Sequence, residues 1–331
     1  KFTIRNLELV FSQAEGGIPL IDVLDKTVTP MGGRMLKKWM VLPLKDKVAI
    51  DNRLDLVEAF HKDKKLREKL LSHLSLIADL ERLISKVAVG RINPRELLTL
   101  RKAMREALPI KELLTKAKTK ELNRIGDQLN PCKLLMERLE AQLSDEAPML
   151  VHQGGIIKDG VNDELDELRK IAYSGKDYLM QIRDREIERT GITSLKIAYN
   201  KVFGYYLEVS NTHKDKVPEE WIRKQTLVNA ERYITEELKV YEEKILSAEG
   251  KLLTIEQNLF NELVEYAGEY VAQIQQNANV LATIDTLIAF AVTAIQNKYN
   301  KPAIEESDEL NIKAGRHPVI EKSLPLGEEY V

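Results

Sequence analysis

Apolar residues recur at helical spacing over most of this chain. Within residues 1–150, the segment TPMGGRMLKKWM predicts a helix with Thr29 as its N-cap and Pro30 in its first turn. The segment NPREL repeats this arrangement, with Asn93 as the expected N-cap and Glu96 at the capping-box position. Three further prolines are expected to divide the remainder into helices of ordinary length: Pro109, Pro131 and Pro148. This region therefore predicts a helical scaffold.

Two longer patterns follow, and both have the spacing of a coiled-coil seam. The first begins at Asn162 and is expected to end at Gly191, which gives a helix of roughly 42 Å. The second runs over about residues 229–279, and a helix of that length would measure on the order of 75 Å. The apolar positions of the first seam alternate spacings of three and four: Leu165, Leu168, Ala172, Gly175, Leu179 and Ile182.

One stretch between the two seams has a different period. In LKIAYNKVFGYYLEVS, residues 195–210, apolar and polar positions alternate on both sides of residues 200–204. Asn200 and Gly204 both tolerate the positive φ that a hairpin loop requires. The stretch therefore predicts a β-hairpin inside a helical protein.

A single helix cannot bury an apolar stripe by itself. The simplest arrangement packs the two long helices antiparallel and holds the β unit at their far end. The fold class is therefore mainly α, with a discontinuous helical domain that carries long antiparallel helices and an inserted small β-rich domain at the tip. That tip is where a ligand surface is expected first.

Composition limits the possible functions. The chain has 331 residues, of which 31% are charged and 6% aromatic, and its net charge is −2. Nucleic-acid binding would therefore have to come from a local patch. The single cysteine, Cys132, excludes an intrachain disulfide and fits a reducing compartment. No apolar run looks long enough to span a bilayer, and the start at Lys1 suggests a piece of a longer protein.

The segment after the hairpin, residues 211–234, contains the types of side chain that contact phosphate backbones. Its amide and hydroxyl groups belong to Asn211, Thr212, Gln225, Thr226 and Asn229. The cations of the segment and of the hairpin are Lys196, Lys201, Lys214, Lys216, Arg223, Lys224 and Arg232. Nearby acids dilute this charge, so composition alone favours a solvated face of a small β domain over nucleic-acid contact. Trp221 is expected to anchor that domain's core rather than stack on a base.

Signals for an enzyme are missing from the sequence. It contains no G-x-x-x-x-G-K-[ST] loop, and its five histidines do not have metal-ligand spacing. The acid pair Asp163 and Asp166 fits a solvated helix face better than acid–base chemistry. We therefore expect no catalytic residue, no metal site and no cofactor site in this chain.

Several ordered segments resemble the MutS family of DNA mismatch-recognition proteins. IRNLELV, LIDVLDKTVTPMGGRMLKKWMVLPL and DLERLISKVAVGRINPREL are similar to its core, or lever, domain. GGIIKDGVNDELDELR resembles the start of its descending lever helix. YNKVFGYYLEVSNTH and RKQTLVNAERYITEELKVYEEKIL resemble its clamp domain and returning helix, and GRHPVIE resembles the first strand of its ATPase domain.

This resemblance implies a domain organisation: residues 1–175 and 241–300 form the core, 176–240 the clamp and 301–331 the beginning of the ATPase domain. Proteins of this family form dimers that encircle double-stranded DNA, use ATP and Mg, and work with a MutL-type protein in the bacterial cytoplasm, associated with the nucleoid. The mismatch-reading and connector domains and the Walker motifs are not in this sequence. The implied function is non-specific backbone binding by the clamp, coupled mechanically to an ATPase domain.

Carried over by motif, the clamp candidates are Arg223, Lys224, Gln225, Thr226, Asn229 and Arg232, with Lys196 and Lys201 on the strands as further candidates. Both arginines are expected to be exposed. Val228 stands where the family often has a basic residue, so one phosphate contact is expected to be missing. The alternative is a coiled-coil scaffold whose head binds a protein partner.

Overall fold

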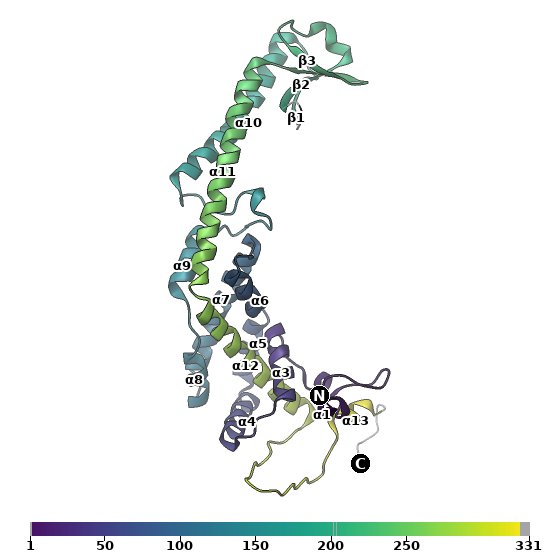
Figure 1. Cartoon of the computed structure of the whole chain (residues 1–331), viewed down its shortest axis with the longest axis vertical. Coiled ribbons are helices and arrows are strands. Elements are labelled where there is room, and N and C mark those ends of the chain that lie inside the picture. The colour runs from purple at the N-terminus through teal and green to yellow at the C-terminus, as the bar shows by residue number, and fades with distance from the viewer. Residues whose placement is uncertain (1, 201, 203, 325–331) are drawn as a thin grey trace. The chain divides into compact units, whose positions relative to one another are not determined.

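The computed structural model describes residues 2–200, 202 and 204–324 of the chain (Figure 1). The fold is mainly α-helical and carries one four-stranded antiparallel sheet, which confirms the predicted fold class. The chain divides into two compact units. Unit 1 contains residues 1–140 and 263–331, and unit 2 contains residues 141–262.

Unit 1 is a helical domain built around one long apolar helix, α12 (Val271–Asn297). Its shorter helices are α1 (Phe2–Asn6), α2 (Leu20–Leu24), α3 (Pro30–Val41), α4 (Lys47–Lys62), α5 (Lys64–Leu74), α6 (Leu80–Ala88), α7 (Pro94–Thr115), α8 (Lys120–Asp127) and α13 (Pro318–Ser323). Helix α9 (Lys133–Gln142) contains the boundary between the units, because the first segment of unit 1 ends at Glu140. Helices α2 to α6 all contact α12, which explains why this helix is apolar around most of its circumference.

The expectation that no apolar run could span a bilayer was wrong as to length. Helix α12 is long and apolar enough for a membrane span, with a mean hydropathy of 1.8 over its most apolar window. Two thirds of that window is buried inside the protein, however, and the helix carries buried polar side chains. Asp285, for example, accepts hydrogen bonds from the backbone N–H and the hydroxyl of Thr29, at 2.8 and 2.6 Å. Its apolar character is therefore explained by its position in the core of unit 1.

The predicted helix starts in unit 1 are confirmed. The Thr29 hydroxyl accepts from the Gly32 N–H at 2.9 Å, and Asn93 and Glu96 form the expected capping box.

Cys132 is buried, and burial raises the pKa of its thiol to about 11.

Two local expectations for these helical segments were wrong. Pro109 does not end a helix but lies inside α7, because Ile110 and Leu114 beyond it are fully buried and hold the helix in the core. The GRHPVIE segment does not form a strand. Pro318 occupies the first turn of the short helix α13, and the four described strands all lie elsewhere.

Unit 2 is an antiparallel helix pair that carries the sheet. Helix α10 (Asp163–Thr190) ends at Gly191, which adopts the predicted left-handed conformation with φ 68°. Helix α11 (Glu236–Gly268) returns alongside it. Arg169 pairs with Glu256 at 2.5 Å, while the Tyr178 and Tyr241 rings stack with centroids 3.9 Å apart. The sheet lies at the end where α10 finishes and α11 begins (Figure 1).

The second long pattern is not one helix over residues 229–279. Its first residues form a strand, α11 begins only at Glu236, and a turn at Glu269 and Tyr270 separates α11 from α12. There the two N–H groups bond to the carbonyls three residues earlier, which tightens the chain and ends the helix. The 3.6-residue period continues through the turn, so the sequence pattern did not reveal it.

The sheet has the strand order β1-β2-β4-β3. Its first hairpin, β1 (Lys196–Asn200) and β2 (Gly204–Ser210), is the one that the sequence predicted. A 3₁₀-helix, η2 (Asn211–Lys216), follows, and then a second hairpin of β3 (Ile222–Thr226) and β4 (Ala230–Ile234). We call residues 196–234 the β head.

Candidate nucleic-acid interface

One face of the β head is a small apolar core packed on the helix pair. Leu207 and Val209 of β2 point into it, and Trp221 and Tyr233 are almost completely buried there. The helices contribute Leu179, Ile182, Leu238 and Ile245. Trp221 therefore anchors this core, as predicted, and does not offer its ring to a base.

The opposite face carries a row of polar side chains that crosses all four strands. The register places Lys196 opposite Glu208, Glu208 opposite Arg232, and Arg232 opposite Gln225. The Arg232 guanidinium donates to Glu208 Oε2 at 3.0 Å and to Gln225 Oε1 at 2.9 Å. This row brings four sequence-distant polar residues onto one surface.

Arg232 is less exposed than predicted from the sequence. Only 20% of its side chain is accessible, and its guanidinium lies 4.5 Å from the centroid of the Tyr206 ring. A central strand position explains this, because side chains on both neighbouring strands cover it. Glu208 already balances the charge of Arg232. The main role of this arginine is therefore to link β4 to its two neighbouring strands.

Arg223 is exposed, as expected, but its charge is also balanced. The side chain is 61% accessible and pairs with Glu231 Oε1 at 3.3 Å. Glu231 also accepts a hydrogen bond from the Tyr233 hydroxyl, and this bond, together with Arg223, lowers the pKa of the Glu231 carboxyl. Burial, helped by the same bond, raises the pKa of Tyr233 to about 12. The three side chains thus form a closed group at the base of the β3–β4 hairpin.

Lys224 differs from both arginines. It lies where the β3–β4 register shifts, at a β-bulge between Arg223 and Gln225. The bulge places one extra residue on the edge strand, and the Lys224 side chain is exposed. No ion pair or hydrogen bond of its ammonium is found in the part of the chain that the structure describes.

The β3–β4 turn lies against the start of η2. The Asn211 amide donates to the Val228 carbonyl at 2.9 Å, and the Asn211 N–H donates to the Asn229 carbonyl at 3.2 Å. These bonds use backbone oxygens, which leaves the exposed Asn229 side chain and Val228 at the surface. At the end of β2, the Ser210 hydroxyl is hydrogen-bonded to the hydroxyls of Ser194 and Thr212, at 2.9 and 2.8 Å.

Lys224, Thr226 and Asn229 are thus three exposed residues of one hairpin. Lys196 lies on the other edge strand, at the same level of the sheet as Arg232 and Gln225. Lys201 lies outside the described residues. Lys214 of η2, which is not among the predicted contact residues, is exposed and has no ion pair among the residues described. Within the described residues, no group of His, Cys, Asp or Glu could hold a metal ion.

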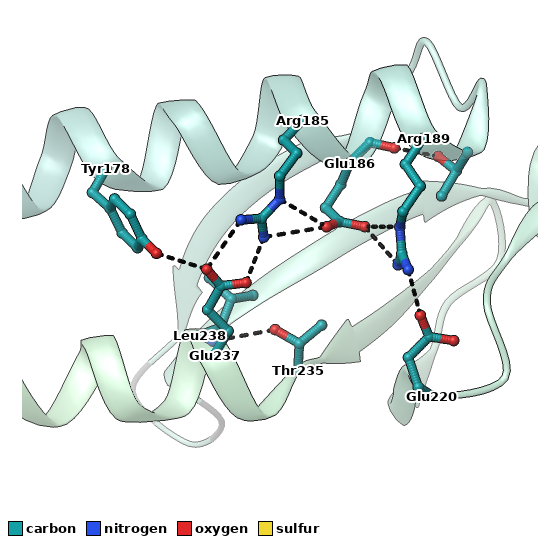
Figure 2. A network of polar contacts seen from close by, with 9 residues as sticks. Tyr178, Arg185, Glu186, Arg189, Glu220, Thr235, Glu237 and Leu238 are labelled. Carbon is teal, nitrogen blue, oxygen red and sulfur yellow. Dashed lines mark hydrogen bonds and ion pairs between the residues drawn. The ribbon is translucent and has the colours of Figure 1, made fainter.

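A network of charged side chains ties the β head to the helix pair (Figure 2). Glu186 of α10 is buried between Arg185 and Arg189. Arg189 reaches Glu220, just before β3, at 2.6 Å, while Arg185 pairs with Glu237 in the first turn of α11. The hydrogen bond from Arg185 lowers the pKa of Glu237, which also accepts from the Tyr178 hydroxyl at 2.7 Å. This network joins α10, the segment before β3 and the first turn of α11.

The comparisons with known proteins agree with this architecture. A family model described as MutS domain III matches residues 2–291. The chain is 57% identical over all its 331 residues to the DNA mismatch repair protein MutS of Bacteroides thetaiotaomicron and 58% identical to that of Bacteroides fragilis. It is 59% identical to the protein of the same name from Cytophaga hutchinsonii.

The chain therefore has the fold of a helical protein with an inserted β domain, and it belongs to the MutS domain III family. It spans 38–39% of the length of these curated relatives.

Proposed function

We propose that the β head binds the backbone of double-stranded DNA without reading its sequence, as part of a mismatch-repair protein. The observation that carries this proposal is the exposed edge of the β3–β4 hairpin. It presents Lys224 without a balancing carboxylate on the same hairpin as the exposed Thr226 and Asn229. Phosphate oxygens take this combination of ammonium, hydroxyl and amide donors.

The charge balance of the head supports weak binding by a few contacts. Arg223 and Arg232 are neutralised by carboxylates of the head itself, whereas Lys196, Lys214 and Lys224 are exposed and have no ion pair among the described residues. The lysines lose no existing ion pair when they meet a phosphate. The proposal therefore assigns the contacts to the lysines and assigns positioning to the two arginines.

The domain organisation and the partners belong to the same proposal. The curated relatives are named DNA mismatch repair proteins, and the proposed boundaries place the clamp at residues 176–240, with the core on either side. The homodimer, the MutL-type partner and ATP with Mg belong to the whole protein and not to this segment. With no phosphate-cradling loop in its sequence, the chain should not hydrolyse ATP, and turnover that scales with its concentration would contradict this.

One observation favours the alternative of a protein-binding head. Val228 is 92% exposed at the tip of the hairpin, and Ile222 is 53% exposed on the edge strand. Exposed apolar residues on an edge strand are a common protein-binding feature. Substitutions at Val228 distinguish DNA binding from protein binding, because this residue lies on the same hairpin as the proposed phosphate contacts.

The test is a titration of labelled duplexes, one perfectly paired and one mismatched, at low salt. Both should bind alike. Lys224→Ala combined with Lys214→Ala should weaken binding about equally for both duplexes, whereas Lys251→Ala on the exposed face of α11 should not. Val228→Lys should strengthen binding, and Val228→Glu should weaken it. Binding that does not respond to any of these substitutions would refute the assignment to the hairpin edge.

A further inference from the structure

A second region of the molecule has the features of a ligand site, and it lies in unit 1. A pocket of about 690 Å³ opens between α3, α4, the end of α12 and residues 299–302. The aromatic rings of Trp39 and Phe290 stand side by side in its wall, with centroids 6.3 Å apart. Aliphatic side chains complete the apolar lining: Met40, Ile50, Leu54 and Val57. Its size lies within the range typical of small-molecule sites.

Arg53 gives this apolar pocket a specific polar group. Its guanidinium lies 3.5 Å from the centroid of the Trp39 ring, and burial lowers its pKa. No carboxylate pairs with it in the described part of the chain. A stacked, partly desolvated guanidinium that lacks an anion is positioned to accept one.

The other charged groups of the lining do not satisfy Arg53. Glu58 is the only carboxylate among the lining residues, and it pairs with both Lys62 and Lys301. The hydrogen bond from Lys62, followed by that from Lys301, lowers the pKa of Glu58 to about 2. Lys301 also pairs with Asp55, which lies outside the lining, so Arg53 is the lining guanidinium or ammonium group that keeps no carboxylate partner among the described residues.

One lining residue, Tyr299, also carries a buried hydroxyl without a hydrogen-bond partner among the residues described. A phenol is protonated near neutral pH at its ordinary pKa of about 10, and burial raises the pKa of this one further.

We propose that this pocket binds a small amphipathic carboxylate, a molecule with one carboxyl group on an aryl or alkyl body. The apolar body packs against Trp39 and Phe290, and the carboxylate accepts hydrogen bonds from Arg53. The pocket shares no residue with the proposed DNA-binding surface, since every residue that lines it belongs to unit 1 and the β head belongs to unit 2.

Tryptophan fluorescence tests this proposal directly. The chain has two tryptophans, one in each unit, so Trp221→Phe leaves Trp39 as the reporter of the pocket. Phenylbutyrate should change the Trp39 emission with a saturable dependence. It should bind about tenfold more tightly than phenylbutanol, the uncharged analogue, because one charge-assisted hydrogen bond is worth about that factor.

Variants then identify the anion-binding group. Arg53→Met should remove the preference for the carboxylate, whereas Arg105→Met, at an exposed position on α7 that does not line the pocket, should keep it. The comparison of phenylbutyrate with phenylbutanol in the Trp221→Phe chain needs no change at Arg53, so it decides the question even if Arg53→Met fails to fold. Equal binding of the two compounds, or no saturable signal, would overturn the proposal. A preference that survives in Arg53→Met would also overturn it.

Discussion

Arg232 and Lys224 lie on neighbouring strands, and their surroundings give them different roles. Arg232 is enclosed by Glu208, Gln225 and Tyr206, whereas Lys224 projects from a bulge on the edge strand. The sequence presents both as basic residues in one polar segment. Only the strand order shows that the first holds the sheet together and that the second is available to a ligand.

This difference predicts different effects on stability. Arg232→Ala should lower the free energy of unfolding of unit 2 by about 1–3 kcal/mol, because it leaves the half-buried Glu208 and Gln225 without their donor. Lys224→Ala should change it by less than about 0.5 kcal/mol. Urea unfolding followed by Trp221 fluorescence, in a Trp39→Phe background, measures both. Equal effects of the two substitutions would contradict the assigned roles.

Tyr233 predicts how the β head responds to alkaline pH. Its folded-state pKa is about 12, raised first by burial and then by the bond to Glu231, and the unfolded value is about 10. The neutral phenol is favoured in the folded state. Its contribution is therefore complete below pH ~10 and is lost as the pH rises towards ~12.

The measurement is the urea midpoint of Trp221 fluorescence as a function of pH, in chains with Trp39→Phe. The midpoint should fall between pH ~10 and ~12 and should fall less steeply in Tyr233→Phe, which has no phenol to ionise. A Tyr199→Phe variant serves as the control, because Tyr199 is 48% exposed and makes no bond to Glu231. An identical decline with and without the Tyr233 hydroxyl would show that this group is not responsible.

At the scale of elements, regular periodicity and end signals predicted the fold well. Thr29, Asn93 and Gly191 act through local backbone geometry, so their roles can be derived from a few neighbouring residues. The hairpin at residues 196–210 was predicted because one of its faces is buried, which produces alternation in the sequence.

The β3–β4 hairpin was missed for the corresponding physical reason. Strand β3 lies at the edge of the sheet, and its five residues Ile222–Thr226 are exposed or only half-buried on both faces. Without a buried face there is no alternation to detect. The site was therefore predicted as a polar segment, while its geometry, its bulge and its charge balance depend on pairing with β4, which the sequence pattern does not contain.

Two glycines of the helix pair should respond in opposite directions to the same substitution. Gly191→Ala places a Cβ at φ 68° and should destabilise unit 2 by about 1–2 kcal/mol. Gly250→Ala lies in the middle of α11, where an added Cβ meets no atom, and should stabilise it by about 0.5–1 kcal/mol. Urea unfolding of both variants, again followed by Trp221, checks the pair. Destabilisation by Gly250→Ala would mean that this face of α11 is not open.

At the scale of the whole molecule, the two units have separate cores and separate candidate sites. Unit 1 encloses α12 and carries the carboxylate pocket, while unit 2 holds the β head on its helix pair. The family assignment covers both units, because the matching region runs from residue 2 to residue 291. The central claim concerns the β head, namely that it holds DNA by a few phosphate contacts through its free lysines.

The salt dependence of duplex binding tests that claim most directly. Each neutralised phosphate releases counterions, so about three lysine contacts predict a slope of roughly −3 for the logarithm of the binding constant against the logarithm of the salt concentration. In the Lys214→Ala, Lys224→Ala double variant the slope should flatten by about 2, equally for perfect and mismatched duplexes. An unchanged slope in this variant, or a clear preference for the mismatched duplex, would contradict non-specific backbone binding by these lysines.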